Sequence, residues 1–201
     1  MNTSQSPADV CEVHDLQFTV YSYPSHQSSN WRARAQLKTA NRNPQTPPPA
    51  SPVPDLLQQL RAGLTTHSAE ETRSLAERLA HVLPRNATLA LHGDLGAGKT
   101  TFVQGLAHGL GIQSSITSPT FTIFTIHRGP IASLVHLDAY RLENDRQIDS
   151  LMLEDFLITP YILAVEWPEK IASWLPETAW HFSLGITSEQ NHFVRLDKSA
   201  A

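Results

Sequence analysis

One octapeptide restricts what this chain can fold into more than any other segment. It occupies residues 93–100, matches the pattern G-x-x-x-x-G-K-[ST] and reads Gly93-Asp94-Leu95-Gly96-Ala97-Gly98-Lys99-Thr100. Glycines permit backbone turns that a Cβ would prevent, and they let amide N–H groups point inward at phosphate oxygens. A helix that follows adds the positive potential of its N-terminus. The pattern therefore predicts a phosphate-binding loop between a strand and a helix.

The segments on both sides of this loop have the composition that the pattern requires. Residues 88–92 (TLALH) predict an apolar strand, and residues 99–110 have helical spacing and end before Gly111, a natural C-cap. We expect Lys99 to contact the β- and γ-phosphates and the Thr100 hydroxyl to bind Mg²⁺. The chain contains neither the Asn-Lys-x-Asp motif that reads guanine nor an LSGGQ-type signature. Adenine is favoured by elimination, so the expected ligands are ATP and Mg²⁺.

Periodicity beyond residue 64 predicts strands that alternate with helices. Ser68 is expected to cap a helix over residues 71–83, with Glu71 completing a capping box and Pro84 ending the helix. Further expected elements are strands at 121–127, 131–138 and 162–166, a helix at 149–156, and a hairpin of 182–186 with 192–196. The alternation predicts an α/β P-loop NTPase fold, with a central mostly parallel sheet, added antiparallel strands and helices on both faces.

The composition changes near residue 55. Eight of the 14 prolines precede it, and the run 43–54 (NPQTPPPASPVP) has neither a helical nor a strand period. We therefore expect residues 1–60 to form a disordered Pro/Ser-rich extension and residues 61–201 to form a P-loop ATPase domain. The alternative for residues 16–23 (LQFTVYSY) is that they pair as a strand.

Charge and cysteine content exclude several classes of function. The net charge is −4, and because residues 1–63 carry +1 the remainder carries −5. Such a chain is not built mainly to neutralise nucleic-acid phosphates. A single cysteine excludes an internal disulfide and a Cys-based zinc site. The sequence has no membrane-spanning apolar run and no secretory signal pattern, so we expect a cytoplasmic protein without membrane contact.

Two acidic residues and one hydroxyl-rich segment are candidates for phosphate chemistry. Asp138 and Glu166 each end an apolar run, where ligands of open α/β sheets bind, although each acid can also simply cap a loop. His136 shares a strand face with Asp138, but a packed or solvated histidine is favoured over a catalytic one. Residues 117–122 (TSPTFT) form either a loop that contacts the γ-phosphate or an ordinary polar turn.

Five motifs in a fixed order carry a family resemblance. They read HGDLGAGKTTFVQGLAHGLG, SPTFTI, HLDAYRL, LEDFL and VEWPEK, and they extend over roughly residues 66–198. On these motifs the chain resembles the TsaE family, small P-loop ATPases of the bacterial pathway that makes threonylcarbamoyladenosine in tRNA. The VEWPE motif is far more specific than the P-loop alone. The chain departs from the family in its long N-terminal extension and in Ala139, where leucine is commoner.

The resemblance implies roles for individual positions. Thr100 and Glu166 correspond to the metal ligands, and Asp138 corresponds to an acid that serves catalysis together with Lys99. The nucleotide-binding positions correspond to Asp94, Leu95, Gly96, Ala97, Gly98, Lys99, Thr100 and Thr101.

Three further segments are given roles by the same resemblance. Ser118, Pro119 and Thr120 resemble a switch-like loop. Thr72 is the candidate for a hydroxyl near the adenine. Trp167 resembles a tryptophan near the nucleotide, or it is a plain core residue.

The resemblance also implies partners. Family members act with TsaD and TsaB, contact tRNA only indirectly, and use ATP hydrolysis to reset that complex. Two alternatives remain open. One is a small-molecule kinase, for which Arg141 and Arg146 are the available lid arginines, and the other is a nucleotide-dependent binding module with little hydrolysis.

Overall fold

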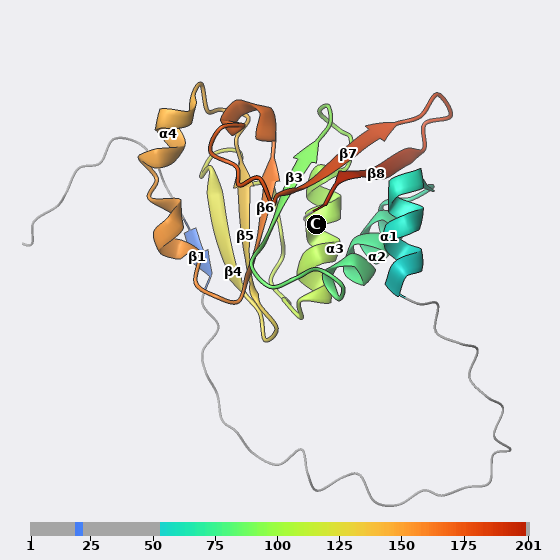
Figure 1. The fold of residues 1–201 in the computed structure, drawn as a ribbon, viewed down its shortest axis with the longest axis horizontal. Helices are drawn as coiled ribbons and strands as arrows, with labels where there is room; N and C mark the ends of the chain where they lie inside the picture. Colours follow the sequence, from blue (N-terminus) through green and yellow to red (C-terminus); the bar gives the residue numbers. More distant parts are fainter. Residues whose placement is uncertain (1–18, 22–52, 200–201) are drawn as a thin grey trace, which may run out of the picture.

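The computed structural model describes residues 19–21 and 53–199. Within these residues eight strands form one sheet in the order β1-β4-β5-β6-β3-β7-β8-β2 (Figure 1). The strands are β1 (Thr19–Tyr21), β2 (Leu64–Thr66), β3 (Ala87–His92), β4 (Phe124–Arg128), β5 (Ser133–Asp138), β6 (Tyr161–Glu166), β7 (Trp180–Ile186) and β8 (His192–Lys198). The helices are α1 (Val53–Ala62), α2 (Ala69–Ala80), α3 (Lys99–Gly109) and α4 (Asp145–Asp149), with 3₁₀ helices η1 (Leu153–Phe156) and η2 (Pro168–Ile171).

The sheet has a parallel centre. Strand β3 pairs in parallel with both β6 and β7, and β6 pairs in parallel with β5. Antiparallel pairing joins β4 to β5, β8 to β7 and β2 to β8. This arrangement confirms the expected mostly parallel sheet with added antiparallel strands. Because β3, β5 and β6 run in one direction, the residues that end them (His92, Asp138 and Glu166) lie at the same edge.

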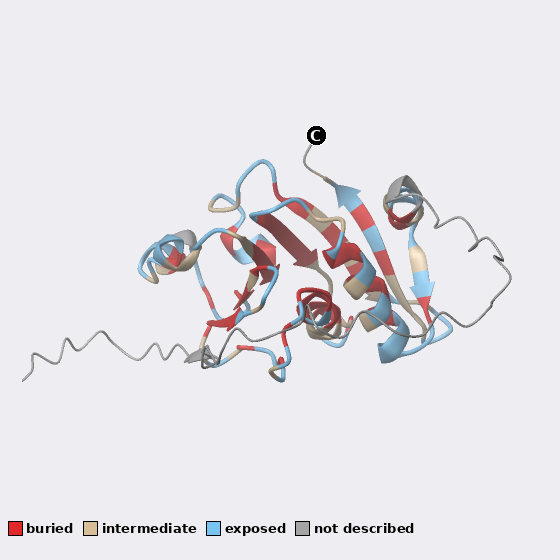
Figure 2. Ribbon diagram, turned by 90° about the horizontal axis from the view of Figure 1, so that it is seen from below, coloured by how far each residue is buried: buried red, intermediate tan, exposed pale blue. Residues whose placement is uncertain are grey.

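Helices cover both faces of the sheet, as the fold class requires. One apolar cluster joins Leu89 and Leu91 of β3 to residues of α1, α2 and α3, and a second joins Val135 and Val165 to residues of α4, η1 and η2. In Figure 2 the buried residues concentrate on the strands and on the helix sides that face them. None of the described helices is long and apolar enough to cross a membrane.

Helices α2 and α3 approach each other closely through glycine. A Cβ on Gly105 would lie 2.2 Å from the carbonyl oxygen of Arg73, and one on Gly109 would lie 2.6 Å from that of Glu77. No side chain fits at such a distance, so these two positions set how near the helices can come. The close contact holds α3, and the loop that precedes it, against the rest of the domain.

The capping box predicted for α2 is present. The Ser68 hydroxyl accepts a hydrogen bond from the Glu71 amide at 3.1 Å, and the Glu71 carboxylate accepts one from the His67 amide at 2.8 Å. The helix ends at Ala80, short of the expected residue 83, because the chain turns at Leu79, whose carbonyl accepts from the amides of Val82 and Leu83.

Two expected elements differ in extent or continuity. The strand expected from residue 121 begins at Phe124, since a Pro119–Thr122 turn and Ile123 at φ 64° precede it. The helix expected over residues 149–156 is wrong as a single element. It is replaced by α4 and η1, because Asn144 caps an earlier start and Met152 adopts a left-handed conformation at φ 47°.

Two N-terminal elements bear on the expected domain boundary. Helix α1 begins at Val53 and buries Leu56 and Leu60 in the core that joins α1 to α2 and α3, so packing starts at least five residues before residue 61. Strand β1 pairs in parallel with β4, which agrees with the strand alternative for residues 16–23 over part of its length. The disorder expected for residues 1–18 and 22–52 lies outside the described residues and stays a prediction.

Candidate functional site

The glycine-rich loop between β3 and α3 has a shape that only glycine permits at two positions. Gly93 has φ 144°, and a Cβ there would lie 2.2 Å from the carbonyl oxygen of Leu184 on β7. Gly98, the N-cap residue of α3, is left-handed at φ 93°. L-residues with a side chain rarely adopt this region, so the pattern of glycines reflects the geometry of the loop.

Lys99 begins α3 and folds back over the loop. Its side chain is 5% exposed, and its ammonium donates hydrogen bonds to the carbonyl oxygens of Gly93 at 2.6 Å and Asp94 at 2.9 Å. The Nζ atom also lies 4.1 Å from the ring centroid of Trp167, a cation–π contact. Burial lowers the pKa of the Lys99 ammonium, and the carboxylates of Glu166 and Asp138 act in the opposite direction.

The metal-ligand candidates meet beside the loop. The Thr100 hydroxyl donates to Glu166 Oε1 at 2.8 Å, and the same oxygen lies 2.9 Å from His136 Nε2. Glu166 is 4% exposed. Hydroxyl and carboxylate oxygens are the donors that Mg²⁺ prefers, so the donor chemistry fits this cation.

Asp138 joins the switch-like segment to the sheet. Its Oδ2 accepts hydrogen bonds from the Ser118 hydroxyl at 2.8 Å and the Thr120 hydroxyl at 2.6 Å. Its Oδ1 accepts one from the Tyr140 amide at 3.0 Å. The two hydroxyls also lie 2.6 Å from each other. The carboxylate therefore joins the switch-like segment to the end of β5.

These groups line one cavity of about 390 Å³. The predicted site residues that line it are Leu95, Gly96, Ala97, Gly98, Lys99, Thr100, Thr101, Ser118, Thr120, Asp138 and Glu166. Tyr140 and Trp167 line it as well, and their rings lie 5.0 Å apart. Asp94 contributes its backbone carbonyl oxygen, which accepts a hydrogen bond from the Lys99 ammonium. Pro119 is buried, and it lies in the chain between Ser118 and Thr120.

Thr72 lies apart from this cavity. Its buried hydroxyl bonds to that of Thr66 at 2.7 Å and donates to the Ser68 carbonyl at 3.2 Å. Thr66 is the register partner of His192, whose Nδ1 lies 3.2 Å from the Ala97 carbonyl oxygen of the phosphate loop. Thr72 is thus connected to the loop through β2 and β8, and its role at adenine stays a prediction.

Two histidine contacts near the loop were not predicted from the sequence. His192 reaches it from β8, and no local pattern marks that residue. His136, expected to be packed or solvated, is packed and fully buried, but its contact with Glu166 was not predicted. Its spacing of two from Asp138 was the only signal of its place on this face.

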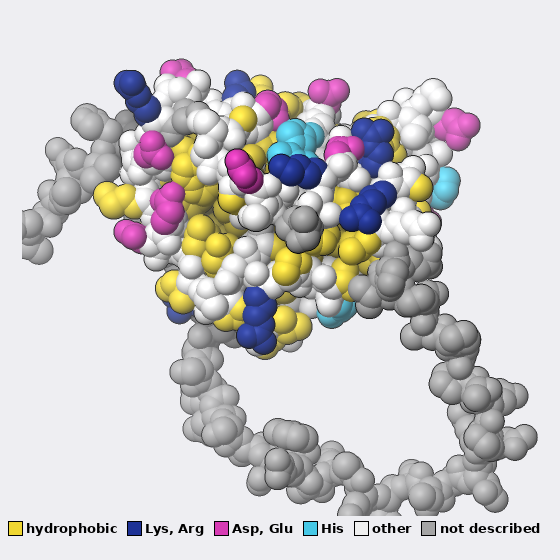
Figure 3. Space-filling view, in the orientation of Figure 1, with side chains coloured by type: hydrophobic (Ala, Val, Ile, Leu, Met, Phe, Trp, Pro, Cys, Tyr) yellow, Lys and Arg dark blue, Asp and Glu magenta, His cyan; other side chains and the backbone are white. Residues whose placement is uncertain are grey.

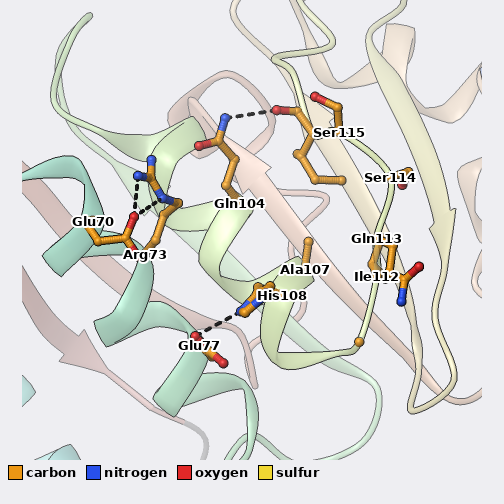
Figure 4. A pocket seen from close by; sticks show the side chains of 12 residues that line it. Glu70, Arg73, Glu77, Gln104, Ala107, His108, Ile112, Gln113, Ser114 and Ser115 are labelled. Carbon is orange, nitrogen blue, oxygen red and sulfur yellow. Dashed lines mark hydrogen bonds and ion pairs between the residues drawn. The ribbon is translucent and has the colours of Figure 1, made fainter.

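A second and larger cavity contains none of the predicted residues. It measures about 750 Å³ and lies between α2, α3 and residues 111–116 (Figure 4). Polar groups line much of it, among them Arg73 paired with Glu70 at 2.6 Å and Gln104, which donates to the Ile116 carbonyl at 3.0 Å. The convergence of carboxylates, hydroxyls and a lysine occurs in the smaller cavity, which is the better candidate for phosphate chemistry.

The described residues include no group of three or more His, Cys, Asp or Glu side chains that could hold a metal ion by themselves. Mg²⁺ needs no such group, because it is commonly bound through one or two carboxylates together with substrate phosphates and water. Thr100 and Glu166 fit that mode.

Comparisons with known proteins agree on one family. The family model described as "Threonylcarbamoyl adenosine biosynthesis protein TsaE" matches residues 66–194. A TsaE protein of Treponema pallidum is 36% identical over 131 residues, which are 65% of this chain and 96% of the relative. One of Bacillus subtilis is 39% identical over 112 residues, which are 56% of this chain and 70% of the relative. Both are named for the biosynthesis of tRNA threonylcarbamoyladenosine.

A solved structure extends the agreement to the fold. The crystal structure of Bacillus subtilis YdiB superimposes with a TM-score of 0.59 at 29% sequence identity. The match covers 69% of this chain and 85% of YdiB. The matched residues include the loop, the switch-like segment and both acidic strand ends, so the chain belongs to the TsaE family of tRNA threonylcarbamoyladenosine biosynthesis.

Proposed function

We propose that this protein binds and hydrolyses ATP with Mg²⁺, and that this activity serves the threonylcarbamoyladenosine modification of tRNA. One observation carries the proposal. Glu166 and Asp138 line the same cavity as the phosphate loop with Lys99 and Thr100, and the Thr100 hydroxyl bonds to Glu166. A P-loop alone binds phosphates, and hydrolysis also needs groups that hold the metal and orient water.

Each residue of the site has a distinct proposed role. The loop amides and the Lys99 ammonium bind the β- and γ-phosphates and neutralise their charge. Thr100 and Glu166 would hold Mg²⁺, which when bound neutralises charge that develops on the phosphates. Asp138 orients the attacking water, whose oxygen bonds to the γ-phosphorus as the bond to the bridging oxygen breaks. ADP and phosphate are the products.

Trp167 and Tyr140 complete the wall beside Lys99. The Trp167 ring faces the lysine ammonium, which limits the positions that the Lys99 side chain can take. The Tyr140 ring packs against that of Trp167 at an interplanar angle of 53°, and the Tyr140 backbone amide donates a hydrogen bond to Asp138. A phosphate in the cavity offers the Lys99 ammonium an anionic partner in place of two backbone carbonyls, which supports binding at this place.

A TsaB–TsaD complex is the proposed partner, with tRNA contacted only through it, in the cytoplasm. Two large apolar side chains at or next to the cavity lining are exposed: Leu95, which lines the cavity, at 88%, and Phe121, which follows the lining residue Thr120, at 80%. Exposed apolar groups beside a site favour a protein partner. On the face seen in Figure 3, the Lys and Arg side chains of the described residues are scattered among Asp and Glu rather than gathered in one basic patch. This one face therefore gives little support to direct tRNA binding.

The kinase alternative has less support. A lid arginine should reach over the phosphates, but the Arg141 guanidinium lies 4.4 Å from the Phe121 ring centroid and does not line the cavity. The binding-module alternative makes the same contacts and differs only in turnover.

The test measures Mg²⁺-dependent ATP hydrolysis by the protein alone and with purified TsaB and TsaD. Stimulation by the partners, absent in Lys99→Ala, is the expected result. Tight ATP binding without hydrolysis in either condition would replace the ATPase proposal with the binding module. Transfer of phosphate to a small molecule in place of water would favour the kinase.

A further inference from the structure

A histidine inside the sheet makes a single hydrogen bond, and that bond goes to the candidate metal ligand. The His136 side chain is fully buried, and its Nε2 lies 2.9 Å from Glu166 Oε1. Its Nδ1 has no hydrogen-bond partner among the described residues. From this geometry we propose that His136 is a positioning residue that holds Glu166 in the orientation needed to bind Mg²⁺; the inference rests on the proposed function of this site.

Among the described residues, the strand neighbours of His136 make no hydrogen bond to its ring. His136 lies between Thr125 of β4 and Ala164 of β6 in the sheet register. The residues two positions away on the same face are Leu134, which belongs to the apolar core, and Asp138. Burying an imidazole costs free energy unless its polar atoms are bonded. The bond to Glu166 is the contact that offsets this cost, so the ring and the carboxylate form one unit.

The geometry at Glu166 shows what the ring does. We assign the imidazole hydrogen to Nε2, because a carboxylate oxygen can only accept. Two donors, Thr100 Oγ1 and His136 Nε2, then meet at the same oxygen, Oε1, and neither contact uses Oε2. Two donors on one oxygen fix the rotation of the carboxylate. Thr100 is itself expected to bind the metal. His136 is fully buried, so its proposed role is limited to positioning Glu166.

Outer hydrogen bonds of this kind matter for metal affinity. Carboxylates that bind metals are themselves held by hydrogen bonds, and loss of such a partner typically lowers metal affinity or activity by about 10–100-fold. The effect is specific to the cation. Phosphate contacts from the loop and Lys99 do not pass through His136, so nucleotide binding without metal should not depend on it.

The experiment titrates Mn²⁺, observed by electron paramagnetic resonance, into the full chain saturated with a non-hydrolysable ATP analogue. Analogue affinity is measured separately in EDTA, and thermal unfolding is recorded for each variant. The variants are His136→Leu, His136→Gln and His136→Asn. Gln can place an amide donor near the position of Nε2, whereas Asn is equally polar but too short. A local control is His127→Leu, since His127 is a similarly buried histidine beside His136, on the neighbouring strand β4, and its ring contacts Ser114 and Thr125.

We expect His136→Leu and His136→Asn to weaken Mn²⁺ binding by about 10–100-fold, with analogue affinity in EDTA unchanged. His136→Gln should restore most of the affinity, and His127→Leu should bind Mn²⁺ as the wild type does. If His136→Leu does not fold, the comparison of Gln with Asn decides the matter alone.

Two results would contradict the inference in distinguishable ways. If the folded His136 variants bind Mn²⁺ as tightly as the wild type while Glu166→Ala does not, the positioning role is wrong and the proposed function stands. If the wild type itself binds no Mn²⁺ with the nucleotide analogue, the proposed metal-dependent function is wrong, and the role of His136 is lost with it.

Discussion

Asp138 and Glu166 are register partners on the neighbouring parallel strands β5 and β6, and each is the last residue of its strand. Both carboxylates are almost fully buried, yet their hydrogen-bond donors differ. Glu166 accepts from Thr100 and His136, which belong to the P-loop helix and the sheet. Asp138 accepts from Ser118 and Thr120 of the switch-like segment. The strand pairing brings the two acids to one edge of the sheet. Because their hydrogen-bond donors differ, we expect the two carboxylates to have different roles.

Different roles predict that substitutions of the two acids change different kinetic quantities, the Mg²⁺ dependence in one case and kcat in the other. Glu166→Gln should raise the Mg²⁺ concentration needed for half-maximal ATP hydrolysis, because the substitution removes the charge of the proposed metal ligand. Asp138→Asn should lower kcat by about 100-fold with little change in that concentration, since groups that orient or deprotonate a nucleophile typically contribute about 10²–10⁴-fold. The measurement is ATPase rate against Mg²⁺ at saturating ATP. Equal shifts of Mg²⁺ dependence in both variants would contradict the division.

The hydroxyl pair that bonds to Asp138 should hold the switch-like segment in place. The double variant Ser118→Ala, Thr120→Val removes two donors to one carboxylate, and we expect the free energy of unfolding to fall by about 2–4 kcal/mol. Limited proteolysis should cut faster within residues 111–122. The exposed Thr117→Ala serves as a control. An unchanged cleavage rate in the double variant would show that other contacts hold the segment.

The contact between α2 and α3 should be intolerant of a single methyl group. In Gly105→Ala the added Cβ meets the Arg73 carbonyl, so the helices must separate, and we expect a loss of about 1–3 kcal/mol in the free energy of unfolding. The exposed His108→Ala on the same helix loses only a surface pair with Glu77, worth at most about 1 kcal/mol. Urea unfolding compares the two. A gain in stability for Gly105→Ala, as helix propensity alone predicts, would mean that the helices have room to adjust.

His127 should make stability depend on pH. Burial, with a smaller contribution from the neighbouring His136, lowers the pKa of His127 from 6.5 to about 4. Between these values the unfolded chain binds a proton that the folded chain does not, so stability falls as the pH drops through this window. Allowing for solvent screening, this residue should account for about 2 kcal/mol.

The check is urea unfolding of the wild type and His127→Gln at pH 7.5 and pH 5. The variant loses the contacts with Ser114 and Thr125 and should be less stable at pH 7.5, but its stability should change less between the two pH values. The exposed His67→Gln should keep the wild-type pH dependence. An equal pH dependence in His127→Gln would assign the effect to other groups.

Helix α1 should contribute to the stability of the domain. Leu60 is fully buried in the core that joins α1 to α2 and α3, and its truncation to alanine should cost about 2–5 kcal/mol. Gln58→Ala, on the exposed side of the same helix, should have little effect. Thermal unfolding of the two variants measures the difference, and equal melting temperatures would show that α1 is not part of the cooperative unit.

Local sequence patterns predicted much of this protein because their physical causes are local. The shape of the P-loop depends on the conformations of its glycines and on the start of α3 at Lys99, directly after Gly98. Both features lie within the octapeptide. The Ser68 cap needs only Glu71, three residues away. Asp138 and Glu166 could be placed without knowing the strand order, since the carboxyl ends of parallel strands meet at one edge.

Other features depend on contacts between residues that are far apart in the chain. The α1 helix was missed because its proline-rich start has no clear period, while the burial of Leu56 and Leu60 is supplied by distant elements. The break between α4 and η1 follows from a left-handed Met152, which no glycine or proline marks.

The sequence by itself determined that this chain would build a phosphate loop followed by a helix, because those contacts form within a few residues. Only the tertiary structure decided that His136 bonds to Glu166, 30 residues away, and that His192 reaches the loop carbonyl of Ala97 from β8. Such contacts depend on which strands become neighbours and in what register. Register is set by packing over the whole sheet, and a local pattern does not contain it.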